Sequence, residues 1–367
     1  MNNEAGNTTG PLCPKQAGLA NSYWVCLLMF FLPFSLGLAP VTAVAAEPDF
    51  DSGLEAARQG DFGLAAEIWL ALAEQGRADA QLEIGILYAT GRGVARDDAE
   101  AIRWYRAAAE QGNTDAQFNL GVRYSLGNGV AQDDVKAIRW YRAAAEHDDP
   151  AAQFNLGLMY SLGRGVQQNE VQEARWYRAA AKQGHVDAQF NLGQMYAEGR
   201  GVPQDDAEAS RLYLAAAEQG DPDAQLNIGI RYTLGRGVPQ DDAEAVSWYR
   251  AAAEQGNADS QFNLGLMYAL GRGVPEDAVE EARWYRAAAE QGHTTAQFNL
   301  GLMYAQGSGV PQDFVTGYMW LSMAAENGNA NAAASRDQIA SIITPTDLFE
   351  AKRRVHDCKA SHYRGCD

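Results

Sequence analysis

Four pairs of adjacent aspartates are the residues whose type and spacing could support acid–base chemistry. General acid–base catalysis needs a carboxylate or similar group held close to the reacting atoms. The pairs recur at the same place in four segments of the chain, however, and an aspartate at the start of a helix satisfies free backbone N–H groups. We therefore interpret them as helix caps, and we predict that the chain is not an enzyme and has no catalytic residue. The pairs are Asp97–Asp98, Asp133–Asp134, Asp205–Asp206 and Asp241–Asp242.

The cysteines are the second candidate for chemistry. Cys358 and Cys366 are eight positions apart near the carboxyl end. In an oxidising compartment such a pair forms a local disulfide, which would fasten the tail. The alternative is a zinc site completed by His356 and His362. We favour the disulfide and expect no metal.

No cofactor is expected either. The recurring Gly-Arg-Gly-Val lacks the third glycine of a dinucleotide-binding loop and the Lys-Ser or Lys-Thr of a P-loop. The sequence also gives no evidence of a small-molecule substrate.

The net charge restricts the kind of partner. The chain has 29 basic and 47 acidic residues, for a net charge of −18. Nucleic-acid binding needs clustered Lys and Arg, so the charge argues against it. The apolar fraction of 47% is too high for a disordered chain.

The amino-terminal segment predicts export. No charged residue lies between Lys15 and Glu47, and the apolar stretch ends in Ala43-Val44-Ala45-Ala46. This pattern is typical of a secretory signal over residues 1–46, cleaved near Ala45 or Ala46. We expect a periplasmic or secreted protein. The alternative is an uncleaved anchor in the inner membrane with the chain facing the periplasm, the one case in which we expect membrane contact.

A fixed period of 36 residues decides the architecture. It predicts a solenoid of stacked units, whereas length alone would suggest two or three globular domains. One set of recurring residues is Gln81, Gln117, Gln153, Gln189, Gln225, Gln261 and Gln297. A second set is Tyr105, Tyr141, Tyr177, Tyr213, Tyr249 and Tyr285.

Each unit is predicted to hold two helices. Residues 115–124 have apolar or small side chains at helical spacing, and Gly127 then ends the helix because glycine adopts a left-handed conformation freely. Asp133 and Asp134 cap a second helix, in which Ile138 and Tyr141 share one face. The fold class is therefore all-α, an α/α superhelical solenoid of 36-residue helix-turn-helix repeats.

The period also predicts the domain organisation. Residues 47–77 form a partial first repeat, and residues 78–329 form seven full repeats. The pattern lapses after Asn329, and Thr344-Pro345 opens a last helix through Val355. We interpret residues 330–367 as a capping helix and a disulfide-bonded tail.

The repeated motif resembles a known family. Ala-x-Ala-Gln-Phe-Asn-Leu-Gly-x-Met-Tyr, then Gly-x-Gly-Val-Pro-Gln-Asp, then Trp-Tyr-Arg-Ala-Ala-Ala-Glu-Gln-Gly, is similar to the Sel1-like repeat. That family is related to tetratricopeptide repeats, and the resemblance implies a right-handed superhelix used for protein–protein contact. Exported bacterial members are adaptors in envelope signalling, polysaccharide control and host interaction. Some relatives pin each hairpin with a disulfide, but these repeats contain no cysteine.

A recurring asparagine is the candidate binding residue. In tetratricopeptide repeats a similarly placed asparagine lines the inner groove and bonds to the backbone of a ligand. We hypothesise that the asparagines, flanked by Phe and Met side chains, contact an extended or helical segment of a partner protein. The alternative is that each one satisfies the backbone of a neighbouring repeat. The residues are Asn119, Asn155, Asn191, Asn227, Asn263 and Asn299; Glu83 replaces asparagine in the first full repeat.

Loop arginines form a further spaced row. They could meet an anionic partner, or adjacent aspartates could neutralise them. The residues are Arg92, Arg164, Arg200, Arg236 and Arg272. Together these features predict an exported scaffold or adaptor that binds another protein, in bacterial envelope signalling or regulation. The alternatives are a secreted factor that engages a host protein and, much less favoured, an envelope-remodelling hydrolase.

Overall fold

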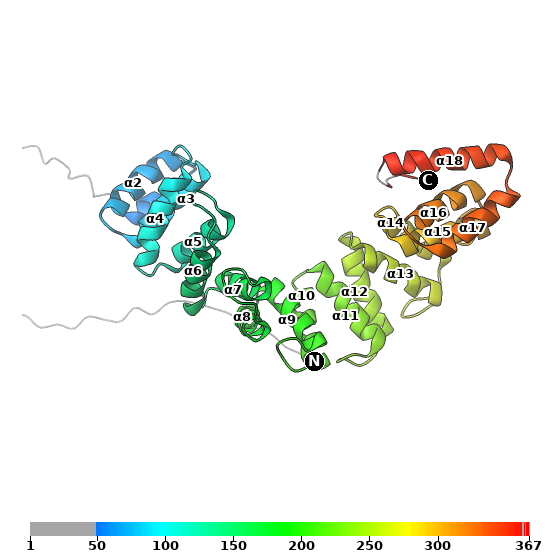
Figure 1. The fold of residues 1–367 in the computed structure, drawn as a ribbon, viewed down its shortest axis with the longest axis horizontal. Helices are drawn as coiled ribbons and strands as arrows, with labels where there is room; N and C mark the ends of the chain where they lie inside the picture. The colour runs from blue at the N-terminus through cyan, green and yellow to red at the C-terminus, as the bar shows by residue number, and fades with distance from the viewer. Residues whose placement is uncertain (1–48, 362, 364, 367) are drawn as a thin grey trace, which may run out of the picture. The chain divides into compact units, whose positions relative to one another are not determined.

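The computed structural model describes residues 49–361, 363, 365 and 366, and these form eighteen α-helices and no strand. Figure 1 shows the helices following one another from blue to red along the chain. In this part of the chain no helix is long and apolar enough to cross a membrane. The predicted signal segment, residues 1–46, lies outside the described residues.

The helices alternate in role with the repeat, as the first and second helix of each pair. Their bounds are α1 Phe50–Arg58, α2 Phe62–Glu74, α3 Ala78–Thr90, α4 Asp98–Glu110, α5 Thr114–Leu126, α6 Asp134–Glu146, α7 Pro150–Leu162, α8 Glu170–Lys182, α9 Val186–Glu198, α10 Asp206–Ala217, α11 Pro222–Leu234, α12 Asp242–Glu254, α13 Ala258–Leu270, α14 Ala278–Ala289, α15 Thr294–Gln306, α16 Phe314–Glu326, α17 Ala330–Ile342 and α18 Pro345–Ala360. Each full repeat is one antiparallel pair, from α3–α4 to α15–α16. The predicted all-α solenoid of 36-residue helix pairs is confirmed.

Local signals set the ends of each helix. In the second repeat the Asn113 side chain accepts from a backbone N–H and begins α5, while Gly127, with φ of 74°, ends it. The side chain of Asp133 then caps α6. The first aspartate of each predicted pair is a cap in the same way, so the helix-cap interpretation is confirmed. These caps are Asp97, Asp133, Asp205 and Asp241.

A glycine and a tyrosine hold the two helices of a repeat together. A Cβ atom on Gly121 would lie 2.5 Å from the ring of Tyr141, so only glycine lets the ring pack this closely on α5. Tyr141 is almost completely buried there. The same glycine–tyrosine contact recurs in the first six repeats, and Leu321 takes the place of the tyrosine against Gly301 in the seventh.

Successive repeats are joined through a row of buried glutamines, one in each first helix, which we call the glutamine row. Gln225 of α11 donates from Nε2 to the carbonyl of Ala217 at the end of α10, and the last carbonyls of a helix have no partner within it. Its Oε1 accepts from Gln255, which follows α12. One side chain thus ties three helices. The row is Gln81, Gln117, Gln153, Gln189, Gln225, Gln261 and Gln297, and all seven donate to the equivalent alanine.

The two ends depart from the repeat. Helices α1 and α2 form a shortened pair before the first full repeat. At the other end α17 forms where the sequence motif lapses, because Asn329 caps it and Ala332 and Ile339 are buried against α16 and α18. The last helix, α18, extends beyond the predicted end at Val355 to Ala360.

Candidate functional site

The candidate site is one face of the first helices. In the second repeat it consists of Asp115, Asn119, Val122 and Leu126, whose spacing of four, three and four residues places them on one side of α5. These four are exposed or half-buried, whereas Ala116 on the other side is fully buried. We call the equivalent positions of all seven repeats the first-helix face.

All six candidate asparagines lie half-buried on this face. Asn155 and Asn227 donate from Nδ2 to carbonyls of their own helices, four residues earlier, at 2.8 Å. In the described part of the chain no asparagine of the six bonds to the backbone of another repeat. That inter-repeat role belongs to the glutamine row, whose recurrence in the sequence does not by itself indicate which groups it bonds.

The predicted neighbours of the asparagines were partly wrong. Methionines do not flank them: Met159, Met195 and Met267 are at most 4% exposed and belong to the core. The phenylalanines also turn inward, as Phe154 stacks on the rings of Tyr177 and His185. Phe154 directly precedes Asn155, and a one-residue step on a helix rotates by about 100°, so its ring faces a different side. Met159 follows Asn155 by four residues and is buried because it packs into the core at the edge of this face. Aspartates and aliphatic side chains flank the asparagines instead.

Exposed leucines form the apolar part of the first-helix face. Each is the last residue of a first helix, and each is 54–61% exposed. They are Leu126, Leu162, Leu234 and Leu270. Half-buried aliphatic side chains lie four residues before them, at positions 122, 158, 230 and 266. The fourth repeat differs, because Gln194 and Glu198 occupy these two positions.

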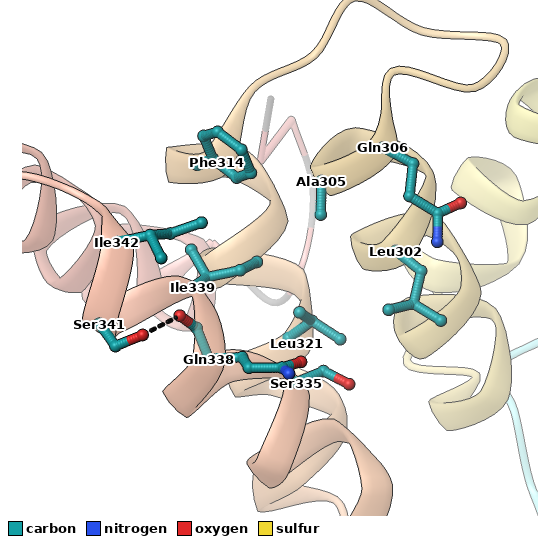
Figure 2. A pocket seen from close by; sticks show the side chains of 10 residues that line it. All are labelled: Leu302, Ala305, Gln306, Phe314, Leu321, Ser335, Gln338, Ile339, Ser341 and Ile342. Atoms are coloured by element: carbon teal, nitrogen blue, oxygen red, sulfur yellow. Dashed lines mark hydrogen bonds between the residues drawn. The ribbon is translucent and has the colours of Figure 1, made fainter.

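A cavity of about 360 Å³ shows how this face continues from one helix pair to the next. Figure 2 shows Leu302 of α15 and Ile339 and Ile342 of α17 around one hollow, with Phe314 and Leu321 of α16 beside them. The lining is largely apolar. The first helices of neighbouring pairs therefore present side chains to the same opening.

Three of the five loop arginines pair with carboxylates, whereas Arg92 lies over the ring of Phe62. Arg164 pairs with Asp134 and Arg272 with Asp242, each at 2.6 Å, and in each case the carboxylate belongs to the preceding repeat. Arg200 pairs with Glu198 at 2.6 Å. Of the two interpretations, neutralisation by adjacent carboxylates is the one the structure supports for these three residues. It also gives the second aspartate of two pairs a structural role.

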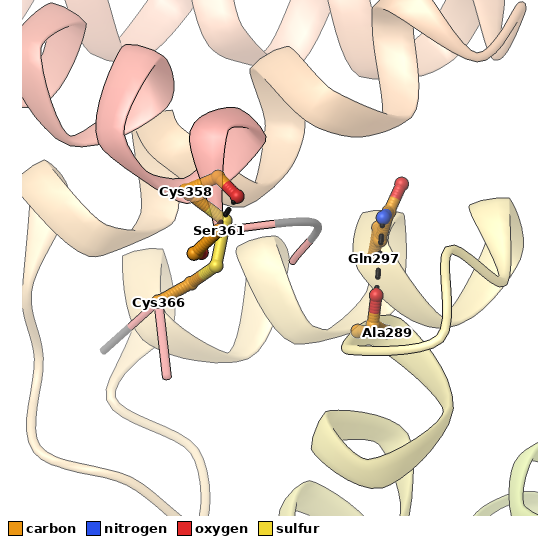
Figure 3. Close-up of a disulfide and its surroundings, with 5 residues drawn as sticks. All are labelled: Ala289, Gln297, Cys358, Ser361 and Cys366. Atoms are coloured by element: carbon orange, nitrogen blue, oxygen red, sulfur yellow. Dashed lines mark hydrogen bonds between the residues drawn. A yellow bond between two sulfur atoms is a disulfide. The ribbon is translucent and has the colours of Figure 1, made fainter. Parts of the chain in front are cut away.

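The carboxyl-terminal cysteines form a disulfide. Cys358 and Cys366 are joined with their Cα atoms 5.0 Å apart, and both are buried against the last full repeat. Figure 3 shows the bond near the Gln297–Ala289 hydrogen bond of the glutamine row. No group of three or more His, Cys, Asp or Glu residues in the described part of the chain could hold a metal ion. His362 of the zinc alternative lies outside the described residues.

The comparisons with known proteins agree with this architecture. The Sel1 repeat model matches seven consecutive segments, 78–113, 114–149, 150–185, 186–221, 222–257, 258–293 and 294–329. The chain belongs to the Sel1 repeat family. Sel1 repeat proteins are protein-interaction scaffolds that bind other proteins.

Two solved structures are similar over most of their length. A Sel1 repeat protein from Oxalobacter formigenes is 36% identical, with a TM-score of 0.61, over 80% of this chain and 87% of that one. The c5321 protein, a protective antigen of uropathogenic Escherichia coli with an SLR fold, is 29% identical, with a TM-score of 0.51, over 86% and 84%. No curated protein matches the chain.

Proposed function

We propose that this Sel1 repeat chain is an exported scaffold that binds another protein through the first-helix face and acts as an adaptor or regulator in the bacterial envelope. The observation that carries the proposal is the asparagine at the same half-buried position of six consecutive repeats. Asparagine is a poor helix former, and these six make no hydrogen bond to the backbone of another repeat in the described residues. Asn191 and Asn299 contact the hydroxyls of Tyr177 and Tyr285 in the preceding repeat, but no such contact in the described part of the chain explains the other four, so the recurrence supports a ligand.

The supporting physical argument is hydrogen-bond capacity. An asparagine side chain offers two N–H donors and an acceptor, and Asn155 and Asn227 each use a donor within their own helix. Their acceptor oxygens remain on the face. A row of such amides can hold the backbone of an extended or helical segment, which has donors and acceptors of its own.

The test compares two triple variants of the full chain. Asn191→Ala, Asn227→Ala and Asn263→Ala together should abolish capture of the envelope protein that the wild type retains, without changing the melting temperature. The matched control, Gln189→Ala, Gln225→Ala and Gln261→Ala, removes three side chains from the same helices and should lower the melting temperature. A lower melting temperature in the asparagine variant, with capture retained, would contradict the proposal.

A second candidate is a secreted factor that engages a host protein. It is favoured by the similarity to c5321, whose description is that of a protective antigen. Cell fractionation separates the two candidates. Protein found in the periplasm supports the envelope regulator, and protein found only in the medium supports the secreted factor.

A further inference from the structure

Charge on the first-helix face has one sign. Its positions hold seven carboxylates in the seven full repeats and no Lys or Arg. The carboxylates are Asp79, Glu83, Asp115, Asp187, Glu198, Asp223 and Asp259. The loop arginines Arg164 and Arg272 pair with carboxylates outside this row, and Arg106, Arg142, Arg178 and Arg250 of the second helices donate to tyrosine hydroxyls.

Three of these seven carboxylates have a basic neighbour. Asp79 pairs with Arg77, Glu198 pairs with Arg200, and Asp259 lies 3.4 Å from Nε2 of His293. Asp115 and Asp187 are exposed, and no ion pair with Lys or Arg reaches either of them in the described residues. The pKa of Glu83 is raised, first by burial and then by the negative charges of Asp115 and Asp79. The face therefore carries uncompensated negative charge.

The apolar side chains of the same face fall into two blocks. The first block belongs to the first three repeats and consists of Ile86, Val122, Leu126, Leu158 and Leu162. The second belongs to the fifth to seventh repeats and consists of Ile230, Leu234, Leu266, Leu270 and Leu302. Gln194 and Glu198 of α9 separate them. Exposed aliphatic side chains that recur in register mark an interaction surface, since isolated ones would be scattered.

We propose that the first-helix face binds a cationic amphipathic segment of a partner protein, whose apolar side chains contact the two leucine-containing blocks and whose Lys or Arg side chains pair with the aspartates. This inference rests on the proposed function, that the face binds a protein. Charge complementarity selects the occupant: apolar contacts hold the segment, and opposite charges steer it and fix its register. A second copy of the chain would place carboxylates against carboxylates, and the same carboxylates would repel an anionic lipid surface.

The probe is a labelled synthetic peptide of Leu and Lys, about 18 residues or roughly five helical turns long, with all leucines on one side. Fluorescence anisotropy with the full chain should show binding that weakens as salt rises from about 0.05 to about 0.5 M. A peptide of identical pattern with Glu in place of Lys should not bind. Equal binding of the two peptides would overturn the proposal.

Two sets of variants locate the contact. Leu234→Ser with Leu270→Ser should weaken binding of the Leu/Lys peptide by about tenfold or more. The control, Val135→Ser with Val279→Ser, changes two valines that are 65% exposed but lie in second helices, and it should leave binding unchanged. Asp115→Asn with Asp187→Asn removes charge without removing volume, and it should reduce both the affinity and its salt dependence. Unchanged affinity in the leucine variant, with the fold verified by circular dichroism, would contradict the inference.

The outcome separates this inference from the proposed function. If the asparagine variant loses its envelope partner but the Leu/Lys peptide does not bind the wild type, the face binds a protein. The proposal that this partner presents a cationic segment is then wrong. If the asparagine variant keeps its partner and the peptide does not bind, both proposals fail.

Discussion

Gln255 donates a 2.8 Å hydrogen bond from Nε2 to Oε1 of Gln225, thirty residues earlier in the chain. Gln225 in turn donates to the carbonyl of Ala217 at 3.2 Å. These two side chains thereby connect the end of α10, helix α11 and the end of α12. Because the arrangement recurs along the chain, the glutamine row carries much of the polar contact between repeats.

Removing a member of this row should destabilise the chain. Gln225→Ala removes the hydrogen bonds to the Ala217 carbonyl and from the Gln255 amide, although these groups keep weaker or local partners in the Gly220 N–H and the Ala251 carbonyl. Each lost hydrogen bond is worth about 0.5–1.5 kcal/mol. We expect a lower urea midpoint, measured by circular dichroism. The control is Gln194→Ala, which removes an amide from the first-helix face and should leave the midpoint nearly unchanged. Equal losses in the two variants would show that the row has no special role.

The junction of the second and third repeats contains a defect that can be repaired. His147 occupies the position of Gln255 in its repeat, and Oε1 of Gln117 is buried with no hydrogen-bond partner. Asp148 has a φ of 61°, where other repeats have glycine. His147→Gln with Asp148→Gly should therefore raise the free energy of unfolding by about 1–2 kcal/mol, from the new hydrogen bond and the relieved backbone.

Thermal and urea unfolding of the double variant and both single variants check this expectation. The gain should divide between the single changes, since each corrects a different fault. A double variant no more stable than the wild type would contradict it.

Much of the fold could be predicted because its signals are local and recur. Gly127 ends a helix and Asp133 begins the next, and neither depends on distant contacts. The face that each side chain takes was harder to predict. Gln117 and Asn119 recur with the same period, but two steps along a helix rotate by about 200°, so one is buried and the other half-exposed. Packing against the neighbouring helices decides which of the two sides is buried.

Part of the carboxyl-terminal end was also difficult to predict from the sequence pattern. Helix α17 has neither the tyrosine nor the paired glycines of the motif, so the sequence pattern did not indicate it. Its position depends on burial of Ala332 and Ile339, a tertiary contact. Helical spacing placed Val122 and Leu126 on the same accessible face as the candidate asparagine, but the aspartates beside them became apparent only from burial.

The disulfide should stabilise the carboxyl-terminal end locally. It closes a loop with a sequence separation of eight residues, and loop-closure entropy for this length corresponds to about 2–3 kcal/mol. Cys358→Ser with Cys366→Ser should increase amide hydrogen exchange in α18 and leave α5 to α12 unchanged. Hydrogen exchange is measured by mass spectrometry of the peptides from each helix. Reduction of the wild type with a thiol should reproduce the pattern of the variant. Unchanged exchange in α18 would contradict this role.

His185 should make stability depend on pH. Its Nδ1 accepts from the backbone N–H of Ala188 and caps α9, while its ring stacks on Phe154. Burial lowers the pKa of His185 below its ordinary value of 6.5. Above that value the ring is neutral in the folded and the unfolded chain, and it contributes no pH dependence. Below it the unfolded chain binds a proton that the folded chain does not, so the free energy of unfolding falls as the pH falls.

His185→Asn tests this mechanism, because asparagine caps the equivalent helices at Asn113 and Asn257 and does not titrate. The variant should lose less stability than the wild type between about pH 7 and about pH 5, in urea titrations at matched ionic strength. At pH 7.5 the two proteins should differ little, since both supply a neutral acceptor to the first turn of α9. Parallel pH profiles would show that the proton is taken up elsewhere and that His185 acts only as a cap.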